Sequence, residues 1–408
     1  MRIWFISPYN SPPNMGHLNR HFYFAKYLKE LGHEPIIFVN SKVHNTAINN
    51  IRNGSFYLKD DSNGFDTYFI KICDYNNSKI KRIFTFFQYY FRTKKLSKKL
   101  KKPDVIIGSS PHPLAPILAN KLGKKFNCQS IVEIRDLWPE SFVAYNIMKK
   151  NNLFLKLFYL GEKWIYKNAD KIIFLMEGGR DYIINQKWDK KIDLNKIYHL
   201  NNGVDLEKFN FNLINNVFLD KILDDDSKFK ICYAGSIRKV NKIHLLLEVA
   251  DQLKEYKDIV FLIYGNGDCL LKLIERTGEL GLNNVEFKGF VEKDKIPYIL
   301  SKSNLNIIIG ENNELGKYGI SANKIFEYLA SGKPILQTFR TDYSIVKNNK
   351  CGLETSDFSV KEVIDSILYF YNMDNLEYNV YCDNAINTSK KYDFKSLSRK
   401  LIEIIEDH

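Results

Sequence analysis

Short β-rich runs alternate with longer amphipathic segments along the whole chain, and this alternation most constrains its fold. Parallel sheets whose strands are joined by crossover helices produce such a pattern. In the first half, the predicted strands are residues 3–7, 34–39, 67–72, 105–109, 130–134 and 171–175. Residues 17–31 have the apolar spacing of an amphipathic helix, which Gly32 ends.

The same series begins again in the second half, where the predicted strands are residues 230–234, 259–264, 284–288, 305–309 and 334–338, with a helix at 243–253. An Asn- and Asp-rich segment, 202–228, separates the two series. We therefore predict an α/β fold with two doubly wound domains, 1–202 and 203–390, and a separate terminal helix within 391–408. Open sheets of this kind bind ligands beyond the carboxyl ends of their strands, so domains that face each other would hold a ligand between them.

Composition narrows the class of protein. The 408 residues are 45% apolar, which suits a globular protein with a sizeable core. Six scattered cysteines without paired spacing argue against a zinc ribbon or a secreted disulfide framework and favour a reducing cytoplasm. No run approaches the ~20 apolar residues of a membrane span. The net charge of +13 indicates an anionic partner, which could be a nucleic acid, a phosphorylated small molecule or a membrane surface.

One stretch near the end, residues 318–336, reads YGISANKIFEYLASGKPIL. Ser321 or Asn323 can cap the N-terminus of a short helix there. The first turn of that helix offers free N–H groups and a partial positive charge to a phosphate. Gly319 permits close approach of the backbone, and Lys324 adds a cation. The stretch therefore has the features of a phosphate site.

Glu327 lies on the same helix, about 6–9 Å beyond its start at 1.5 Å per residue. That is about the distance from a pyrophosphate to the ribose attached to it, and a carboxylate there could accept hydrogen bonds from two ribose hydroxyls. The alternative is an ordinary helix whose Glu327 and Lys324 face solvent. The spacing alone leaves both readings open.

Motifs in a fixed order along the chain resemble the retaining family 4 glycosyltransferases, which have the GT-B fold. They are PPNMG at 12–16, GHEP at 32–35, EKW at 162–164, NADKI at 168–172, NGVD at 202–205, GFV at 289–291 and the stretch 318–336. The resemblance implies two facing Rossmann-like domains and a terminal helix that packs back on the N-terminal domain. Two segments, IRDLWPE at 134–140 and residues 318–334, are most similar to a bacterial subgroup that builds O-antigen and capsule, including N-acetylfucosamine transferases.

The resemblance also implies an activity. Such enzymes transfer a sugar from a nucleotide donor, here expected to be UDP-linked, with retention at the anomeric carbon and without a metal or other cofactor. The expected acceptor is a glycan on a polyprenyl diphosphate lipid at the inner face of the cell membrane. A GT-B enzyme with a soluble acceptor, or a nucleotide-sugar epimerase, remains an alternative. The sequence does not indicate an oligomeric state.

Site residues follow from the matched motifs and from the chemistry. A leaving diphosphate accumulates negative charge, which cations and backbone donors stabilise. We expect this role for residues after the strand 230–234, favouring Arg238 and Lys242 over Lys239, although an exposed basic helix start is the alternative reading. The remaining donor-binding residues would be Gly16, Gly235, Gly265, Val291, Gly319, Ser321, Asn323, Lys324 and Glu327.

The chain departs from the family pattern in three places. Gly319 stands where an acidic residue usually contacts the donor sugar, eight positions before Glu327. Met15 replaces a frequent second glycine, and the loop after the first strand of the second domain is altered to read GSIRKVNK at 235–242. The donor sugar therefore stays unidentified.

Three residues of the first domain follow predicted strands. His112, between two prolines, could hydrogen-bond the donor sugar, although a lone loop histidine is often incidental. Asp136 could orient or deprotonate the acceptor hydroxyl, or could equally cap the helix that follows. Glu177 is a weaker candidate of the same kind. No cluster has metal-ligand spacing, and Asp224–Asp226 reads as a solvated loop.

Residues 78–102, SKIKRIFTFFQYYFRTKKLSKKLKK, contain ten Lys or Arg and no acid. Cations interleaved with aromatic side chains suit the surface of an anionic bilayer, as a lipid-linked acceptor would require. The alternative is a core helix with a solvated basic face. We do not expect a nucleic-acid partner, because the aromatic residues form one apolar block rather than an exposed stacking platform.

Overall fold

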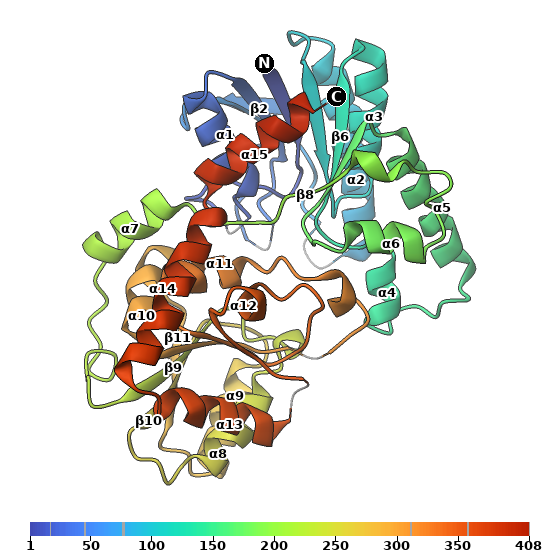
Figure 1. Cartoon of the computed structure of the whole chain (residues 1–408). Coiled ribbons are helices and arrows are strands. Elements are labelled where there is room, and N and C mark those ends of the chain that lie inside the picture. Colours follow the sequence, from blue (N-terminus) through green and yellow to red (C-terminus); the bar gives the residue numbers. More distant parts are fainter. Residues whose placement is uncertain (17, 45, 76–77, 311, 357–358, 408) are drawn as a thin grey trace. The chain divides into compact units, whose positions relative to one another are not determined.

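The computed structural model describes residues 1–16, 18–44, 46–75, 78–310, 312–356 and 359–407. The chain divides into two compact units (Figure 1). The N-terminal unit comprises Met1–Asn201 and Phe394–His408, and the C-terminal unit comprises Asn202–Asp393. The sequence had placed these boundaries at 202/203 and 390/391.

The N-terminal unit is built on an eight-stranded sheet in the order β3-β4-β2-β1-β5-β6-β7-β8. Its strands are β1 (Arg2–Ile6), β2 (Glu34–Asn40), β3 (Tyr57–Asp60), β4 (Asp66–Ile70), β5 (Val105–Ser109), β6 (Gln129–Ile134), β7 (Lys171–Phe174) and β8 (Ile197–His199). Every pairing is parallel except that of β3 with β4. All six predicted strands are present. The two edge strands, β3 and β8, were not predicted because they are short and only partly apolar.

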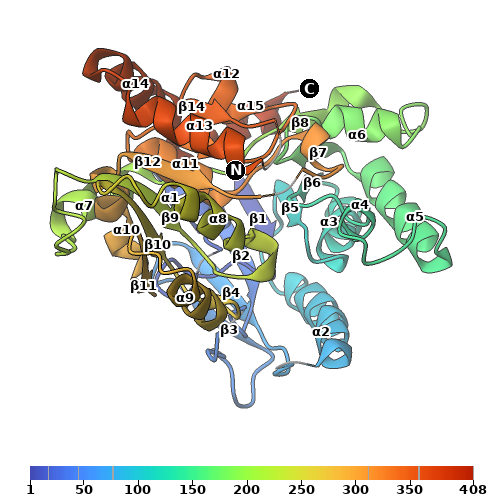
Figure 2. The same ribbon diagram turned by 90° about the horizontal axis from the view of Figure 1, so that it is seen from below.

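Helices cover both faces of this sheet (Figure 2). They are α1 (Arg20–Glu30), α2 (Lys79–Ser97), α3 (Leu114–Phe126), α4 (Glu140–Ala144), α5 (Leu153–Asn168), α6 (Gly179–Asn185) and α15 (Phe394–Glu406). Ile3 and Phe5 of β1 pack toward α1 and α15, and Trp4 and Ile6 pack toward α2 and α3. This alternation is the two-residue period of a strand buried on both faces. The helix predicted at 17–31 is α1, and residue 17 lies outside the described residues.

The terminal helix α15 belongs to the N-terminal unit although the segment before it does not. Leu397, Leu401 and Ile405 enter the core that α1 and the sheet form. The Nζ of Lys171 donates to the carbonyl oxygens of Ile404, at 2.5 Å, and Ile405, at 3.2 Å. These bonds satisfy carbonyl groups that a helix C-terminus leaves without intrahelical partners. The expected return of the last helix to the first domain is confirmed.

A buried ion pair joins the middle of this unit. The Arg20 side chain is fully buried, and its Nε donates to Glu133 Oε2 at 2.8 Å. Its other nitrogens donate to the carbonyls of Leu200, at 3.0 Å, and Asn201, at 2.6 Å, where the chain leaves the unit. Burial is the largest single influence on Glu133 and would raise its pKa, but Arg20, His21 and Arg135 together outweigh it and hold that pKa well below its usual range. Ser109 Oγ donates to the other carboxylate oxygen at 2.7 Å. One guanidinium therefore ties α1, β6 and the end of the unit together.

The C-terminal unit has a six-stranded, fully parallel sheet in the order β11-β10-β9-β12-β13-β14. Its strands are β9 (Phe229–Ala234), β10 (Ile259–Tyr264), β11 (Val285–Gly289), β12 (Leu305–Ile308), β13 (Ile335–Gln337) and β14 (Gly352–Glu354). The helices are α7 (Leu206–Asn215), α8 (His244–Gln252), α9 (Leu270–Glu279), α10 (Ile296–Lys302), α11 (Asn323–Ala330), α12 (Ile345–Asn348), α13 (Val360–Tyr371) and α14 (Asn375–Lys391). The five predicted strands are present, and the three-residue β14 was missed.

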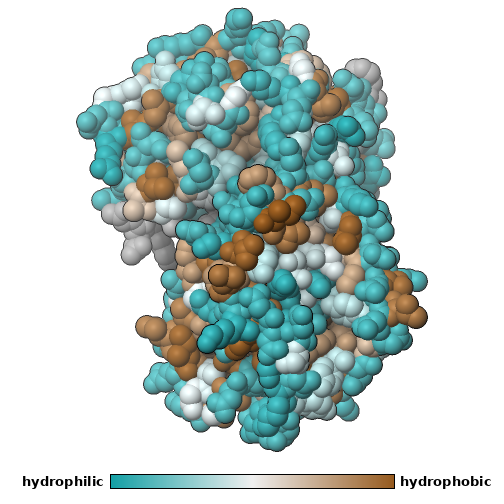
Figure 3. Space-filling model, turned by 90° about the vertical axis from the view of Figure 1, so that its left-hand side faces the viewer, coloured by the Kyte–Doolittle hydropathy of each residue, from teal (hydrophilic) through white to brown (hydrophobic). Residues whose placement is uncertain are grey.

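Helix α7 lies inside the segment that the sequence indicated as a polar connection. Asp205 caps it by accepting a hydrogen bond from Lys208 N at 3.1 Å, and Phe209 is buried in the core. The exposed side of α7 and the residues after it remain apolar at Phe211, Ile214, Val217 and Leu219. Figure 3 views this side and shows apolar side chains gathered at mid-height.

Replacing Arg20 with Met tests the ion pair. The variant would leave the Glu133 carboxylate buried without its cation, a change that costs about 3–5 kcal/mol. We expect the free energy of unfolding of the N-terminal unit to fall by about that amount. Tryptophan fluorescence during urea unfolding measures it, because Trp4, Trp138, Trp164 and Trp188 all lie in this unit.

Two further variants serve as controls. Lys59→Met breaks the exposed Lys59–Asp66 pair of the same unit and should cost no more than about 1 kcal/mol. Arg20→Met combined with Glu133→Leu removes both buried charges and should recover part of the loss. Equal costs for Arg20→Met and Lys59→Met would contradict this role of the buried pair.

Candidate active site

The carboxyl ends of three neighbouring strands in the C-terminal unit are joined by close backbone contacts. Gly265 follows β10 with a φ of +140°, and its N–H donates to the Gly289 carbonyl at 2.7 Å. A Cβ at Gly265 would lie 1.8 Å from the Gly235 oxygen, and a Cβ at Gly267 would lie 2.1 Å from the Ile237 oxygen. Only glycine tolerates these approaches. The loops after β9 and β10 are therefore packed backbone to backbone.

The loop after β9 carries the basic residues that the sequence singled out. Ile237 is fully buried and anchors it, whereas Arg238 and Lys239 are exposed. Lys242 is half-buried and has a φ of +52°. The Asn241 side chain closes the loop by donating to the Ser236 carbonyl at 2.7 Å. The loop thus presents two exposed cations beyond the carboxyl end of a central strand.

Lys324 of α11 lies beside the same strand end. Its Nζ donates to Tyr233 Oη at 2.7 Å and stands 4.2 Å from the centre of the Tyr233 ring. Gly235 leaves room for it, since a Cβ there would lie 2.4 Å from Lys324 Cε. Burial lowers the pKa of Lys324 to about 8, and the nearby Glu327 carboxylate opposes this shift. The structure therefore brings Gly235, Gly265 and Lys324 together.

The start of α11 differs from the prediction. Its N-cap is Ala322, so neither Ser321 nor Asn323 caps it with a side chain. Ser321 Oγ instead accepts a hydrogen bond from Asn202 N at 3.0 Å, and Asn323 Oδ1 accepts one from Asn202 Nδ2. Both side chains are therefore bonded to Asn202 of the NGVD motif rather than to the first turn of α11. In the described part of the chain, no side chain caps the first-turn N–H groups of α11.

Glu327 lies one turn beyond the start of α11, on its half-buried side. Lys293 Nζ is 3.8 Å from its Oε1. Val291 is half-buried and packs against the core beside this helix. Sequence reasoning missed Lys293 and Tyr233. The lysine two positions after the GFV motif was a usable signal, whereas a strand tyrosine looks like any core residue.

Gly319 has a backbone reason to be glycine. It ends a short turn, Gly316–Tyr318, with a φ of +86°, a conformation that side-chain-bearing residues rarely adopt. Tyr318 before it is buried. The acidic residue usual at this position would therefore be strained in this loop.

His112 follows β5, as the sequence predicted, but its side chain is fully buried. Its ring lies 4.7 Å from the Phe86 ring and 5.3 Å from the Tyr89 ring, both on α2. Burial lowers its pKa to about 3, so it is neutral. Among the described residues, neither ring nitrogen has a hydrogen-bond partner.

Asp136 is exposed just after β6. Partial dehydration by the surrounding protein raises its pKa, and the adjacent Arg135 opposes the shift. The alternative role as a helix cap is wrong, because α4 begins at Glu140 after Pro139 and has no side-chain cap. Glu177 is exposed between β7 and α6. These residues belong to the N-terminal unit.

Gly16 lies in the loop between β1 and α1, also in the N-terminal unit. Asn19 Nδ2 donates to its carbonyl at 2.9 Å, and a Cβ there would lie 2.4 Å from Ser11 Oγ. The loop is therefore closely packed around a residue without a side chain.

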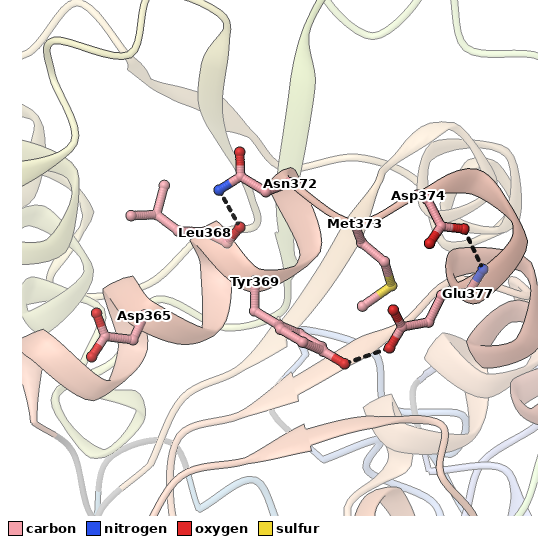
Figure 4. A pocket seen from close by; sticks show the side chains of 7 residues that line it. All are labelled: Asp365, Leu368, Tyr369, Asn372, Met373, Asp374 and Glu377. Carbon is pink, nitrogen blue, oxygen red and sulfur yellow. Dashed lines mark hydrogen bonds between the residues drawn. The ribbon is translucent and has the colours of Figure 1, made fainter.

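A separate pocket lies between α13 and α14 (Figure 4) and is lined by Asp365, Leu368, Tyr369, Asn372, Met373, Asp374 and Glu377. Tyr369 Oη donates to Glu377 at 2.6 Å. Three carboxylates and no cation in this lining would repel a phosphate.

In the described part of the chain, no group of three or more His, Cys, Asp or Glu side chains could hold a metal ion. The Asp225 carboxylate accepts hydrogen bonds from Ser227 in a local turn.

Three solved structures with similar folds cover nearly the whole chain. HepE of Anabaena in complex with UDP has a TM-score of 0.71 at 13% identity, with 100% of both chains covered. A glycosyltransferase from Rickettsia africae has a TM-score of 0.67 at 20% identity, covering 100% of this chain and 98% of its own. WaaG, a glycosyltransferase involved in lipopolysaccharide biosynthesis, has a TM-score of 0.66 at 15% identity, with 100% of both chains covered. No curated protein sequence matches significantly.

Two family models match consecutive parts of the chain. Residues 19–208 match the model described as Glycosyltransferase Family 4. Residues 217–388 match the model described as Glycosyl transferases group 1. The similar structures show the fold, and the two models show the class of enzyme. The chain is a family 4-like glycosyltransferase with the GT-B fold.

Proposed function

We propose that this enzyme transfers a sugar from a UDP-linked donor, with retention at the anomeric carbon, to a glycan carried on a polyprenyl diphosphate lipid. The observation that carries the donor half is the position of Lys324 against Tyr233 and Gly235, beside the uncapped start of α11. A cation with a lowered pKa and free backbone donors converge there. The UDP complex of HepE, which has a similar fold, supports a uridine nucleotide.

The leaving diphosphate would lie over the start of α11. Backbone N–H groups and the positive end of the helix favour an anion there. Lys324 of α11 and Arg238 of the exposed loop after β9 would neutralise the negative charge that grows on the diphosphate as the glycosidic bond breaks. Lys242 and Lys239 follow in the same loop.

Glu327 would hold the ribose. Its carboxylate lies on the same helix one turn beyond the phosphate position and is already turned toward Lys293. A carboxylate accepts hydrogen bonds from both ribose hydroxyls, and Lys293 lies within ion-pair distance of it. Gly265 and Val291 would border the base through the backbone.

The acceptor half of the proposal depends on the N-terminal unit. Asp136 is exposed beyond a strand end, where its raised pKa suits a group that exchanges a proton with a hydroxyl. Helix α2 has a buried side and also an exposed apolar stripe, formed by Ile80, Ile83, Phe84, Phe87 and Phe91. The exposed apolar stripe supports a contact with a membrane surface over a purely solvated basic face. The lipopolysaccharide role of the structurally similar WaaG supports this setting.

Replacing Glu327 with Gln tests the ribose contact. Hydrogen bonds to a charged group contribute about 1.5–3 kcal/mol, so the Kd for UDP should rise about 10- to 100-fold. Calorimetry with UDP measures the change. Glu248→Gln, at an exposed position of α8 in the same unit, should leave the Kd unchanged. If Glu327→Gln binds UDP as tightly as the native enzyme, Glu327 does not hold the ribose.

The pH dependence of UDP binding tests Lys324. Only the protonated amine attracts the diphosphate, and its pKa in the free enzyme is about 8, below the ordinary value of 10.5. The protonated fraction therefore falls above pH 8, while the terminal phosphate of UDP, with a second pKa near 6, stays ionised. We expect UDP affinity to fall about tenfold between pH 7 and pH 9.

Two variants separate Lys324 from the other cations. Lys324→Met should bind UDP more weakly and lose this pH dependence. Arg238→Met should also bind more weakly but keep the slope, since its guanidinium does not titrate in this range. A native affinity that is constant from pH 7 to pH 9 would show that Lys324 does not contact the diphosphate.

A further inference from the structure

The surface of α5 is apolar where a helix of a globular protein is usually polar. The exposed apolar side chains of α5 and of the segment before it are called the α5 face. They are Tyr145, Ile147, Leu153, Phe154, Leu157, Phe158, Leu160 and Trp164. Leu153 is 78% exposed and Phe154 is 67% exposed. Contiguous exposed apolar surface of this kind marks an interaction site.

Helix α5 differs from an ordinary surface helix because its one acidic residue is buried. Glu162 is buried, and its two oxygens accept hydrogen bonds from Tyr166 Oη at 2.6 Å and Tyr182 Oη at 2.8 Å. Burial raises the pKa of Glu162 to about 8, so this carboxyl is mostly neutral at pH 7. Leu155 and Glu162 of α5 thus face the unit, whereas most of its large apolar side chains face outward: Leu153, Phe154, Leu157, Phe158, Leu160 and Trp164. Packing within the unit does not explain the α5 face.

Positive charge surrounds this face. Between residues 145 and 168 the chain has five lysines and one acid, the buried Glu162. Together with the ten basic residues of 78–102, these two segments carry slightly more than the whole net charge of +13. The rest of the chain is therefore nearly neutral. The basic character of this protein is a property of α2, α5 and the residues beside them.

The two segments lie on one side of the N-terminal sheet. Helix α3 packs against both α2 and α5, and Asn120 of α3 donates to the Ile165 carbonyl of α5 at 2.9 Å. Figure 2 shows the three helices following one another along that side. The exposed lysines of α3, Lys121, Lys124 and Lys125, lie toward its C-terminal end. Two apolar stripes thus flank a basic helix.

We infer that the α5 face inserts into the interfacial layer of an anionic bilayer, with the stripe of α2 as a second contact. Large apolar side chains bordered by lysine are typical of helices that lie in the plane of a membrane. In the described part of the chain, no helix is long and apolar enough to cross a bilayer. A second copy of the chain would bring two lysine-rich surfaces together, which repel. The inference deepens the proposed function and rests on it for the lipid-linked acceptor.

Sedimentation with vesicles tests the inference. The native enzyme should bind vesicles of phosphatidylglycerol and phosphatidylethanolamine and should bind phosphatidylcholine vesicles much more weakly. Phe154→Ser combined with Leu157→Ser keeps every charge but removes two inserted side chains, so binding should fall by about thirtyfold or more. Phe211→Ser combined with Leu219→Ser removes the same residue types from the exposed surface around α7 and should leave binding unchanged.

Fluorescence quenching locates the insertion. Brominated lipids quench tryptophans that reach the acyl chains, and Trp164 belongs to the α5 face. The native emission should be quenched, and Trp164→Phe should lose part of that quenching. The inference is overturned if anionic vesicles do not bind, as expected if the α5 face docks an acidic protein instead. It is also overturned if binding persists unchanged in Phe154→Ser/Leu157→Ser without quenching, because attachment would then be electrostatic only.

UDP calorimetry on the same variants separates this inference from the proposed function. Phe154→Ser/Leu157→Ser should bind UDP normally, since neither side chain belongs to the donor site. Loss of vesicle binding with normal UDP binding supports the insertion. A native enzyme that binds vesicles but not UDP would refute the donor half of the proposed function and would still support membrane insertion of the α5 face.

Discussion

The contact between the Gly235 and Gly265 backbones is the constraint on which the donor site depends. A Cβ at Gly265 would lie 1.8 Å from the Gly235 oxygen, so any side chain would force the loops after β9 and β10 apart. The same absence of a side chain at Gly235 gives Lys324 its place against Tyr233. Because the loops are closed at the carboxyl ends of two central strands, a cation, a helix start and a carboxylate converge at one point.

The sequence predicted the central parts of both sheets well, because long apolar runs bounded by glycine or polar residues have few alternatives. It missed β3, β8 and β14, which are edge strands of three or four residues. It also missed α7, whose polar composition resembles a linker until Asp205 caps it and Phe209 is buried. Tertiary packing, rather than local preference, decides these elements.

In the donor site, too, the sequence predicted local features but not contacts between distant residues. The spacing from the start of α11 to Lys324 and Glu327 is local, so the sequence could predict it. The cap of α11, the Tyr233 partner and the Lys293 contact are not local, since they join residues about 35 to 120 positions apart. The N-terminal unit adds a contrast that composition did not indicate. It buries Arg20 and Glu133 as a pair, while α5 leaves leucine and phenylalanine outside.

Hydrogen exchange with and without UDP tests the central claim most directly. If the cradle formed by the loops after β9 and β10 and by α11 holds the nucleotide, UDP should slow amide exchange at residues 235–242, 265–267 and 319–330. The amides lining the acidic pocket between α13 and α14 should exchange at the same rate in both states. Protection confined to that pocket, or no protection at the start of α11, would contradict the account.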